Sequence, residues 1–277
     1  MTRFSAETNL RNYEAPETAA HYAALDYLTA CVRLLFGAYI KPGSAVLDLG
    51  VGGGRTTPYL ASRATRYVGV DYSTAMVQAC RTKFADVEFV VRDAADLSIF
   101  PDASFDAVVF AFNGIDFLVE HADRKACLRH IFRVLKTSGV MIFSSHNPRA
   151  ILVRPAWNHE RLRRMAARPW GGRLYGPVLA ILTAGRFVIA MAQSLIATVP
   201  RVLRRLPSQI FWRGEGNLVE AVHGGLLTHY WTPSRAIEEL AAVGFRPECV
   251  LGDDYPRASH RYATDWYYYV FTKIDTQ

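Results

Sequence analysis

Short apolar runs alternate with segments of helical spacing along most of the chain. The helical segments lie at 15–40, 55–63, 73–84, 121–135 and 233–243. The apolar runs have the length of buried strands and lie at 45–49, 67–70, 87–91, 105–111, 140–144, 247–251 and 266–273. Continuous apolar strands that alternate with helices are typical of a parallel sheet covered by helices on both faces. The pattern therefore predicts a doubly wound α/β fold with seven strands.

The alternation stops after the fifth predicted strand, at about Asn147, and resumes near Thr232. A stretch of this length is too long for a bare loop in a compact domain. We therefore divide the chain into an N-terminal helical segment (1–44), an α/β core (45–147), an insertion (148–215) and the C-terminal part of the core (216–277). We expect the insertion to be helical and to act as a substrate lid.

A glycine-rich segment follows the first predicted strand, with Asp48, Gly50, Gly52 and Gly54 at alternate positions. Glycines at such a turn let the backbone approach a ligand closely, and the next helix offers free N–H groups. The spacing does not fit the Gly-x-Gly-x-x-Gly pattern of dinucleotide-binding domains, because neither register ends on a glycine. The acid inside the strand also suits a cationic ligand better than a pyrophosphate.

Two further acids stand at the ends of the next two predicted strands. Asp71 ends the second strand, where a carboxylate can accept two hydrogen bonds from a ribose diol, and Tyr72 can cover an adenine face. Asp93 follows the third strand, where its carboxylate and the N–H of Ala94 can bind the edge of an adenine. Together with the glycine loop, these residues predict a nucleoside-binding edge of the sheet.

This order of motifs resembles the class I S-adenosylmethionine (SAM)-dependent methyltransferases, over about 45–147 and 233–273. The resemblance implies a mostly parallel sheet with an antiparallel last strand, and SAM as the cofactor. It also implies a set of cofactor-binding residues, with the glycine loop at the methionine part, Asp71 at the ribose and Asp93 at the adenine. That set is Asp48, Gly50, Gly52, Gly54, Asp71, Tyr72, Met76, Asp93, Ala94, Phe112 and Asn113. Tyr13 and Tyr22 join it if the N-terminal segment folds over the cofactor; otherwise they are ordinary helix-packing residues.

The resemblance predicts a SAM-dependent methyltransferase that acts on a small or amphiphilic acceptor by direct in-line transfer. Oxygen is the expected acceptor atom because histidines flank the predicted site, and a base assists transfer to a hydroxyl. The candidate bases are His146, after the fifth strand, and His229, after the insertion. Either is also compatible with a structural role. Two other functions remain open: a non-catalytic scaffold with a decayed pocket, and an N- or C-methyltransferase of a membrane-associated, lipid-linked acceptor.

The net charge of +7 is concentrated in the insertion, which carries twelve arginines and only two acids between Pro148 and Glu215. Its centre, 177–200, is almost wholly apolar, with polar positions on one narrow helical stripe. Three interpretations stay open: a lid packed on the core or on a second subunit, a peripheral membrane contact through 161–205, and an arginine site for an anionic acceptor. Nucleic acid is a less suitable partner because the basic segment is apolar at its centre.

The cysteines Cys31, Cys80, Cys127 and Cys249 are far apart and form no Cys-x-x-Cys pair. This spacing predicts neither a structural metal site nor a disulfide framework, and it favours a reducing compartment. The N-terminus also lacks the apolar run of a signal peptide. We therefore expect a cytoplasmic protein, with the membrane surface as the alternative location.

Overall fold

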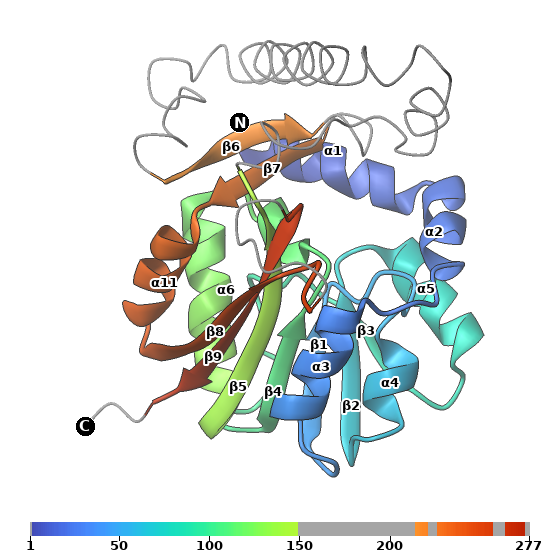
Figure 1. Cartoon of the computed structure of the whole chain (residues 1–277). Helices are drawn as coiled ribbons and strands as arrows, with labels where there is room; N and C mark the ends of the chain where they lie inside the picture. The colour runs from blue at the N-terminus through green and yellow to red at the C-terminus, as the bar shows by residue number, and fades with distance from the viewer. Residues whose placement is uncertain (1, 149–213, 221–225, 257–263, 275–277) are drawn as a thin grey trace, which may run out of the picture.

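The computed structural model describes residues 2–148, 214–220, 226–256 and 264–274. In these residues a seven-stranded sheet has the order β3-β2-β1-β4-β5-β9-β8, and a two-stranded sheet lies above its upper edge (Figure 1). The strands of the large sheet are β1 (Ala45–Leu49), β2 (Arg66–Asp71), β3 (Glu88–Val91), β4 (Phe105–Phe110), β5 (Leu135–His146), β8 (Phe245–Gly252) and β9 (Trp266–Lys273). The small sheet is formed by β6 (Glu215–Glu220) and β7 (Leu226–Trp231).

The helices are α1 (Thr2–Glu14), α2 (Pro16–Ala23), α3 (Ala30–Tyr39), α4 (Thr57–Ala61), α5 (Thr74–Lys83), α6 (His121–Val134) and α11 (Pro233–Ala241). A short 3₁₀ helix, η1 (Gly114–Phe117), follows β4.

The strand directions confirm the predicted class I methyltransferase fold. Strands β1 to β5 pair in parallel, while β9 pairs antiparallel with both β5 and β8. The order reverses between β1 and β4, and in doubly wound sheets ligands bind beside such a reversal, at the carboxyl ends of the strands.

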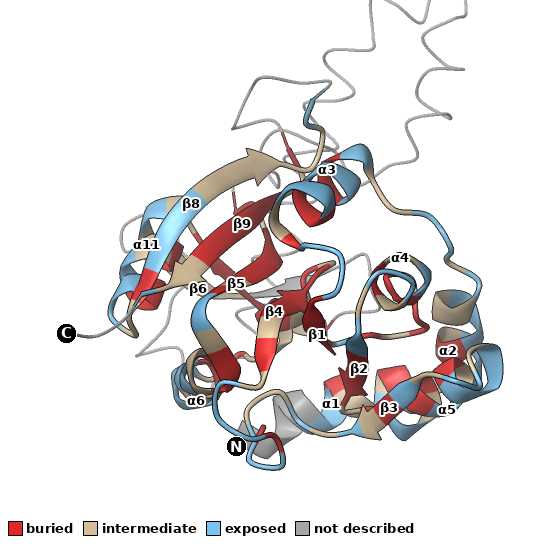
Figure 2. Cartoon of the chain, turned by 90° about the horizontal axis from the view of Figure 1, so that it is seen from below, coloured by how far each residue is buried: buried red, intermediate tan, exposed pale blue. Residues whose placement is uncertain are grey.

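Helices cover both faces of the large sheet. Val32, Leu60 and Val77, from α3, α4 and α5, pack in one cluster with the β1 and β4 side chains of that face. Leu128 and Leu240, from α6 and α11, belong to the cluster on the other face. Figure 2 shows the central strands as buried and the outer strand β8 as partly exposed. Because the central strands are covered on both sides, their sequences are continuously apolar rather than alternating.

The N-terminal segment differs from the single helix predicted over 15–40. Helix α2 ends at Ala23, and α3 begins only after Thr29, whose side chain accepts a hydrogen bond from the N–H of Val32 as an N-cap. Helix α1 falls within the segment 1–44 that was expected to be helical, but its bounds were not predicted, because its sequence is mostly polar and has no clear apolar stripe. Tertiary contacts hold it: the Glu14 carboxylate accepts hydrogen bonds from the N–H groups of Thr74 and Ala75, at the start of α5.

Two strand assignments also changed. Strand β5 begins at Leu135, not at Val140, and its register against β4 shifts between Leu135 and Val140. The β6–β7 hairpin was not predicted, because its residues carry a weaker strand pattern than the core strands do.

The predicted helical lid lies outside the described residues except at its two ends, and so does the predicted membrane contact at 161–205. Among the helices that the structure describes, none is long and apolar enough to span a membrane.

Candidate active site

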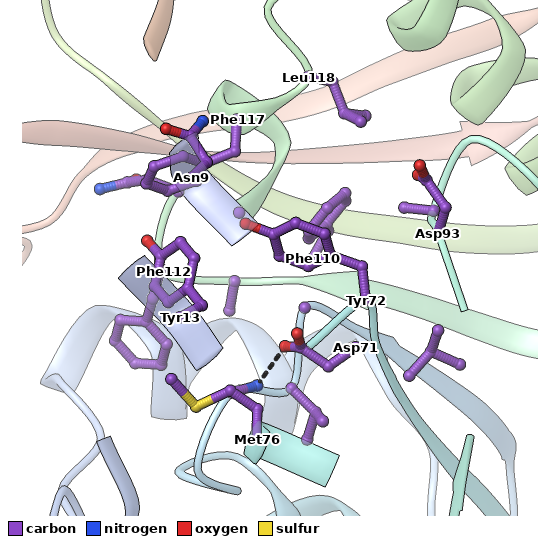
Figure 3. Close-up of a pocket in the computed structure, with 18 of the residues that line it drawn as sticks. Asn9, Tyr13, Asp71, Tyr72, Met76, Asp93, Phe110, Phe112, Phe117 and Leu118 are labelled. Carbon is purple, nitrogen blue, oxygen red and sulfur yellow. Dashed lines mark hydrogen bonds between the residues drawn. The ribbon is translucent and has the colours of Figure 1, made fainter. Parts of the chain in front are cut away.

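A cavity opens at the carboxyl ends of β1 to β5, where the loops after these strands converge. It is lined by residues from these loops together with Asn9 and Tyr13 of α1, which lie across the cavity from Asp93 (Figure 3). Of the sequence-predicted set, the lining includes Tyr13, Tyr22, Gly50, Gly52, Asp71, Tyr72, Met76, Asp93, Ala94, Phe112, Asn113 and His146. The structure therefore brings most of the predicted residues together.

The glycine loop needs its glycines for different reasons. Gly50 and Gly52 have φ angles of +59° and +54°, which favour glycine, and both line the cavity. Gly54 also has a positive φ, but it faces the other way, and a Cβ there would lie 2.5 Å from the ring of Phe84. The third glycine thus permits close packing of the loop on α5 and does not line the cavity.

Asp48 lies beneath the loop and not in the cavity lining. Its carboxylate accepts hydrogen bonds from the hydroxyls of Thr56, at 2.5 Å, and Tyr67, at 2.8 Å. Burial raises the pKa of Asp48 to about 6, although both hydroxyls oppose the shift. The expected direct contact of Asp48 with a ligand is therefore not supported, because its acceptor oxygen is used to fix the loop.

Asp71 ends β2 and faces the cavity with a buried carboxylate. One oxygen accepts the N–H of Gly52 at 2.9 Å, and the other accepts the N–H of Ser73 at 3.0 Å. Burial raises the pKa of Asp71 to about 6, and these backbone donors partly offset the effect. A carboxylate has about four acceptor positions, so the backbone donors leave it capacity for a ligand. The geometry is suited to two neighbouring hydroxyl groups.

The next two loops form the wall beyond Asp71. Tyr72 and Met76 are largely buried there, and burial raises the pKa of the Tyr72 phenol well above its usual range. The Tyr72 hydroxyl has no hydrogen-bond partner among the described residues. Asp93 is exposed at the rim, where one carboxylate oxygen accepts the N–H of Ala95 at 2.8 Å, and Ala94 lines the wall beside it.

The N-terminal helices close one side of the cavity, as expected for Tyr13 and Tyr22. The rings of these two tyrosines meet edge to face, with centroids 5.7 Å apart, and Tyr13 also contacts Tyr72. Asn9, which the sequence analysis missed, is buried, and its Nδ2 donates to the carbonyl of Leu227. Its Oδ1 has no partner among the described residues. The first helix thus contributes polar atoms to the cavity that no local pattern revealed.

His146 stands at the end of β5 and forms a pair with Asp116 of η1. Its Nδ1 lies 2.6 Å from a carboxylate oxygen of Asp116, which also accepts the backbone N–H of His146 at 2.8 Å. The other carboxylate oxygen accepts the hydroxyl of Ser145 at 2.6 Å. Asp116 is fully buried, and burial raises its pKa while the hydrogen bonds from His146 and Ser145 lower it. Because a carboxylate accepts hydrogen bonds, the proton of a neutral His146 belongs on Nδ1, and the lone pair of Nε2 faces the amide N–H of Asn113 at 3.3 Å.

Asn113 marks the side of His146 that faces the cavity. Its Nδ2 lies 3.3 Å from Nε2 of His146, and its backbone N–H donates to Ser144 in a left-handed turn. Asp116 was missed by the sequence analysis. The available signal was a single acid in the apolar stretch Ile115 to Phe117, just after a strand that ends at a ligand site. An ionisable residue in such a place needs a partner, and here the partner is the candidate base.

His229 does not reach the cavity. It is buried on β7, where its Nδ1 lies 2.9 Å from Oδ1 of Asn217 and its ring packs edge to face on Trp231. The structure thus keeps one of the two predicted bases at the site. The expectation for His229 fails because alternate residues of a strand point to opposite sides, and Tyr230 is the β7 residue that contacts His146, at 5.3 Å between ring centroids.

Comparisons with known proteins agree with this fold and site. Residues 46–139 match the family model described as a methyltransferase domain. A demethylmenaquinone methyltransferase of Clavibacter sepedonicus is 38% identical over 120 residues, which is 42% of this chain and 47% of that protein. A carboxy-S-adenosyl-L-methionine synthase of Aliivibrio salmonicida is 35% identical over 127 residues, or 42% and 50% of the two chains. The chain thus spans half or less of the length of these relatives.

Solved structures share the fold of the described residues. A SAM-dependent methyltransferase of Methanosarcina mazei superposes with a TM-score of 0.56 at 16% identity, covering 90% of this chain and 99% of that one. A 1,6-didemethyltoxoflavin-N1-methyltransferase of Burkholderia thailandensis, with S-adenosylhomocysteine bound, gives 0.55 at 15% identity and covers 98% and 87%. The predicted resemblance to the class I SAM-dependent methyltransferases is confirmed: residues 46–139 form a methyltransferase domain within that fold.

Proposed function

We propose that this protein is a SAM-dependent methyltransferase that methylates an oxygen atom of a small or amphiphilic acceptor, with His146 as the general base. The observation that carries the proposal is the contact of 2.6 Å between His146 in the cavity and the buried carboxylate of Asp116. A hydroxyl acceptor loses its proton during methylation, and a histidine positioned by a buried carboxylate at the site can accept that proton.

The cavity residues fit SAM. Asp71 keeps acceptor capacity on a carboxylate that lines the cavity, which supports its assignment to the ribose hydroxyls, and we assign Asp93, at the rim, to the adenine amino group. Three buried polar atoms of the lining have no partner among the described residues: the Tyr72 hydroxyl, Asn9 Oδ1 and Asn113 Oδ1. Buried polar atoms in native proteins are normally hydrogen-bonded, so a polar ligand at this place accounts for them. Gly52 leaves room for the methionine part beside the loop, because a Cβ there would meet only the Tyr22 ring at 3.7 Å, whereas Gly50 allows the Phe110 ring to pack closely on the loop.

The chain contributes positioning and proton transfer. SAM, when bound, supplies an activated methyl group on its sulfonium for in-line transfer to the acceptor oxygen. His146 Nε2 takes the proton of the acceptor hydroxyl, and Asp116 stabilises the imidazolium that results. Asn113, 3.3 Å from Nε2, orients the ring toward the cavity. The Tyr13 and Phe117 rings, 5.4 Å apart, exclude water from the side formed by α1 and η1.

Relatives use more than one kind of acceptor. Their names describe methylation of demethylmenaquinone and of nitrogen N1 of a toxoflavin precursor. The contact of His146 with Asp116 favours oxygen as the acceptor atom for this chain. Nitrogen or carbon methylation, and a non-catalytic scaffold, are the outcomes that the following experiment distinguishes from it.

The first experiment is calorimetry of SAM and S-adenosylhomocysteine on the purified full chain, with NAD as the control ligand. We expect micromolar binding of both sulfur compounds and none of NAD, and loss of both in a folded Asp71→Ala variant. A second step screens acceptors in matched pairs, each a hydroxyl compound and its amino analogue, by the release of S-adenosylhomocysteine. No binding of either sulfur compound to folded protein favours the scaffold. Turnover of amino analogues alone, unaffected by His146→Ala, refutes oxygen methylation with His146 as the base.

A further inference from the structure

Arg55 lies in the cavity wall between two aromatic rings. Its guanidinium carbon is 4.1 Å from the ring centroid of Phe112 and 5.0 Å from that of Tyr27. Contacts of this kind stabilise the cation through its flat faces and restrict the plane in which its N–H groups point. They provide no hydrogen-bond acceptor for those N–H groups.

The structure gives Arg55 no carboxylate partner among the residues it describes. The other arginine of the cavity lining, Arg92, pairs with Asp96 at 3.2 Å. Arg55 is half-buried, always charged, and held in place by Phe112 and Tyr27. A guanidinium that lines a cavity and stacks on aromatic rings is suited to a planar anion such as a carboxylate, which it binds through two parallel hydrogen bonds.

The position of Arg55 relates this charge to the acceptor side of the cavity. The ring on which it stacks belongs to Phe112, and the next residue, Asn113, contacts Nε2 of His146 at 3.3 Å. Two acids of the lining, Asp71 and Asp93, follow β2 and β3, on the other side of β1 from β4 and β5, and two more, Glu120 and Asp123, stand at the start of α6. Arg55 therefore brings a positive charge to the side of the cavity where the proposed base lies.

We propose that Arg55 is a specificity-determining residue that binds a carboxylate of the acceptor, so that the acceptor is a hydroxylated carboxylic acid. This inference rests on the proposed function, because it needs His146 to define the acceptor side. SAM itself carries a carboxylate, and the experiment must separate the two sources of the same chemistry.

The experiment compares benzoate with benzamide, which have nearly the same shape and differ in charge, on the full chain saturated with S-adenosylhomocysteine. We expect benzoate to bind at least about tenfold more tightly than benzamide, since a hydrogen-bonded charged group contributes that much. Arg55→Gln removes this preference, and Arg55→Lys keeps part of it because the charge remains. The control is Arg63→Gln: Arg63 also stacks on a ring, that of Tyr59 at 4.0 Å, but lies outside the cavity lining, so the preference stays.

A second arm uses 5′-methylthioadenosine, which lacks the amino acid part of the cofactor. If benzoate is preferred only in the methylthioadenosine complex, and Arg55→Gln weakens S-adenosylhomocysteine but not methylthioadenosine, then Arg55 binds the cofactor and the acceptor assignment is wrong. Equal binding of benzoate and benzamide in both complexes overturns the anion subsite altogether. If S-adenosylhomocysteine fails to bind, the proposed function fails by itself, and the Arg55-dependent preference in the free protein still decides whether the subsite exists. Thermal melting verifies that each variant is folded.

Discussion

The pair of His146 and Asp116 gives the sharpest test of the proposed chemistry, through the variant Asp116→Asn. The amide has the size of the carboxylate. Its oxygen can still accept from the backbone N–H and Nδ1 of His146, while its NH₂ group faces the hydroxyl of Ser145, which can accept instead of donate. The fold is thus retained, and the variant removes mainly the charge that stabilises the imidazolium.

The magnitude follows from the strength of that contact. A hydrogen bond to a charged group contributes about 1.5–3 kcal/mol, and each 1.4 kcal/mol corresponds to about tenfold in rate. We therefore expect kcat to fall by roughly 10- to 150-fold. The loss reaches about 10⁴-fold if the amide also turns His146 to the wrong tautomer. The affinity for S-adenosylhomocysteine stays unchanged, because Asp116 is buried beneath His146 and is not in the cavity lining.

The assay is the initial rate of S-adenosylhomocysteine release at saturating SAM, with an acceptor found in the screen. Ser145→Ala is the matched control: it also removes a hydrogen bond to Asp116 but leaves the contact with His146, so kcat changes by no more than a few fold. If a folded Asp116→Asn variant has a kcat within threefold of the parent, Asp116 does not stabilise an imidazolium at His146, and the proposal that this pair acts as the general base is wrong.

Two further predictions concern the cofactor side. Because the pKa of Asp71 is raised to about 6 and its protonated form loses acceptor positions, SAM affinity falls as the pH drops through about 6, approaching tenfold per pH unit. The measurement is calorimetric titration from pH 5 to 8. The control is Asp48→Asn: the pKa of Asp48 is also raised to about 6, but Asp48 is outside the cavity lining, so the variant keeps the pH dependence of the parent. A SAM affinity that does not change with pH in the parent protein contradicts the assignment of Asp71. Gly53→Ala weakens SAM binding at least about tenfold, since the added Cβ would lie 2.3 Å from backbone atoms of α2. The control is Gly37→Ala: Gly37 is exposed in α3, so this variant raises the unfolding free energy by up to about 1 kcal/mol. Equal SAM affinity in Gly53→Ala and parent shows that the contact of α2 with the loop is dispensable.

The sequence predicts the large sheet well because each strand is buried on both faces and reads as a continuous apolar run. The segment at 45–49 agrees with β1, and 266–273 agrees with β9. The same pattern fails for α1 and for the β6–β7 hairpin. Their stability comes from partners far along the chain, such as the Glu14 carboxylate at the start of α5, and periodicity within one segment carries no record of such partners.

The candidate site divides in the same way. Asp71 and the glycines were predictable because a loop after a parallel strand is brought to the ligand edge by the fold itself. Asp48 was assigned to the ligand because the sequence shows its position in the strand but not that Thr56 and Tyr67 use its oxygen. Asp116 and Asn9 reach the site only through tertiary packing, so their roles became visible with the structure.

The contact of Tyr230 with His146 has a consequence for how this enzyme class can diversify. The chain leaves the sheet at Asn147, directly after His146, and returns through β6 and β7, where Tyr230 packs on the same histidine. His146 is therefore next to the point where the chain leaves the sheet and also contacts the hairpin through which it returns. A graft that exchanges residues 149–213 between homologues, with Asn147 and the hairpin retained, leaves Asp116, Asn113 and Tyr230 as the neighbours of His146. A graft that also replaces the hairpin removes the contact of Tyr230 with His146. The sequence of 149–213 and the surroundings of the proposed base can therefore be exchanged independently only when both cuts fall between Asn147 and β6.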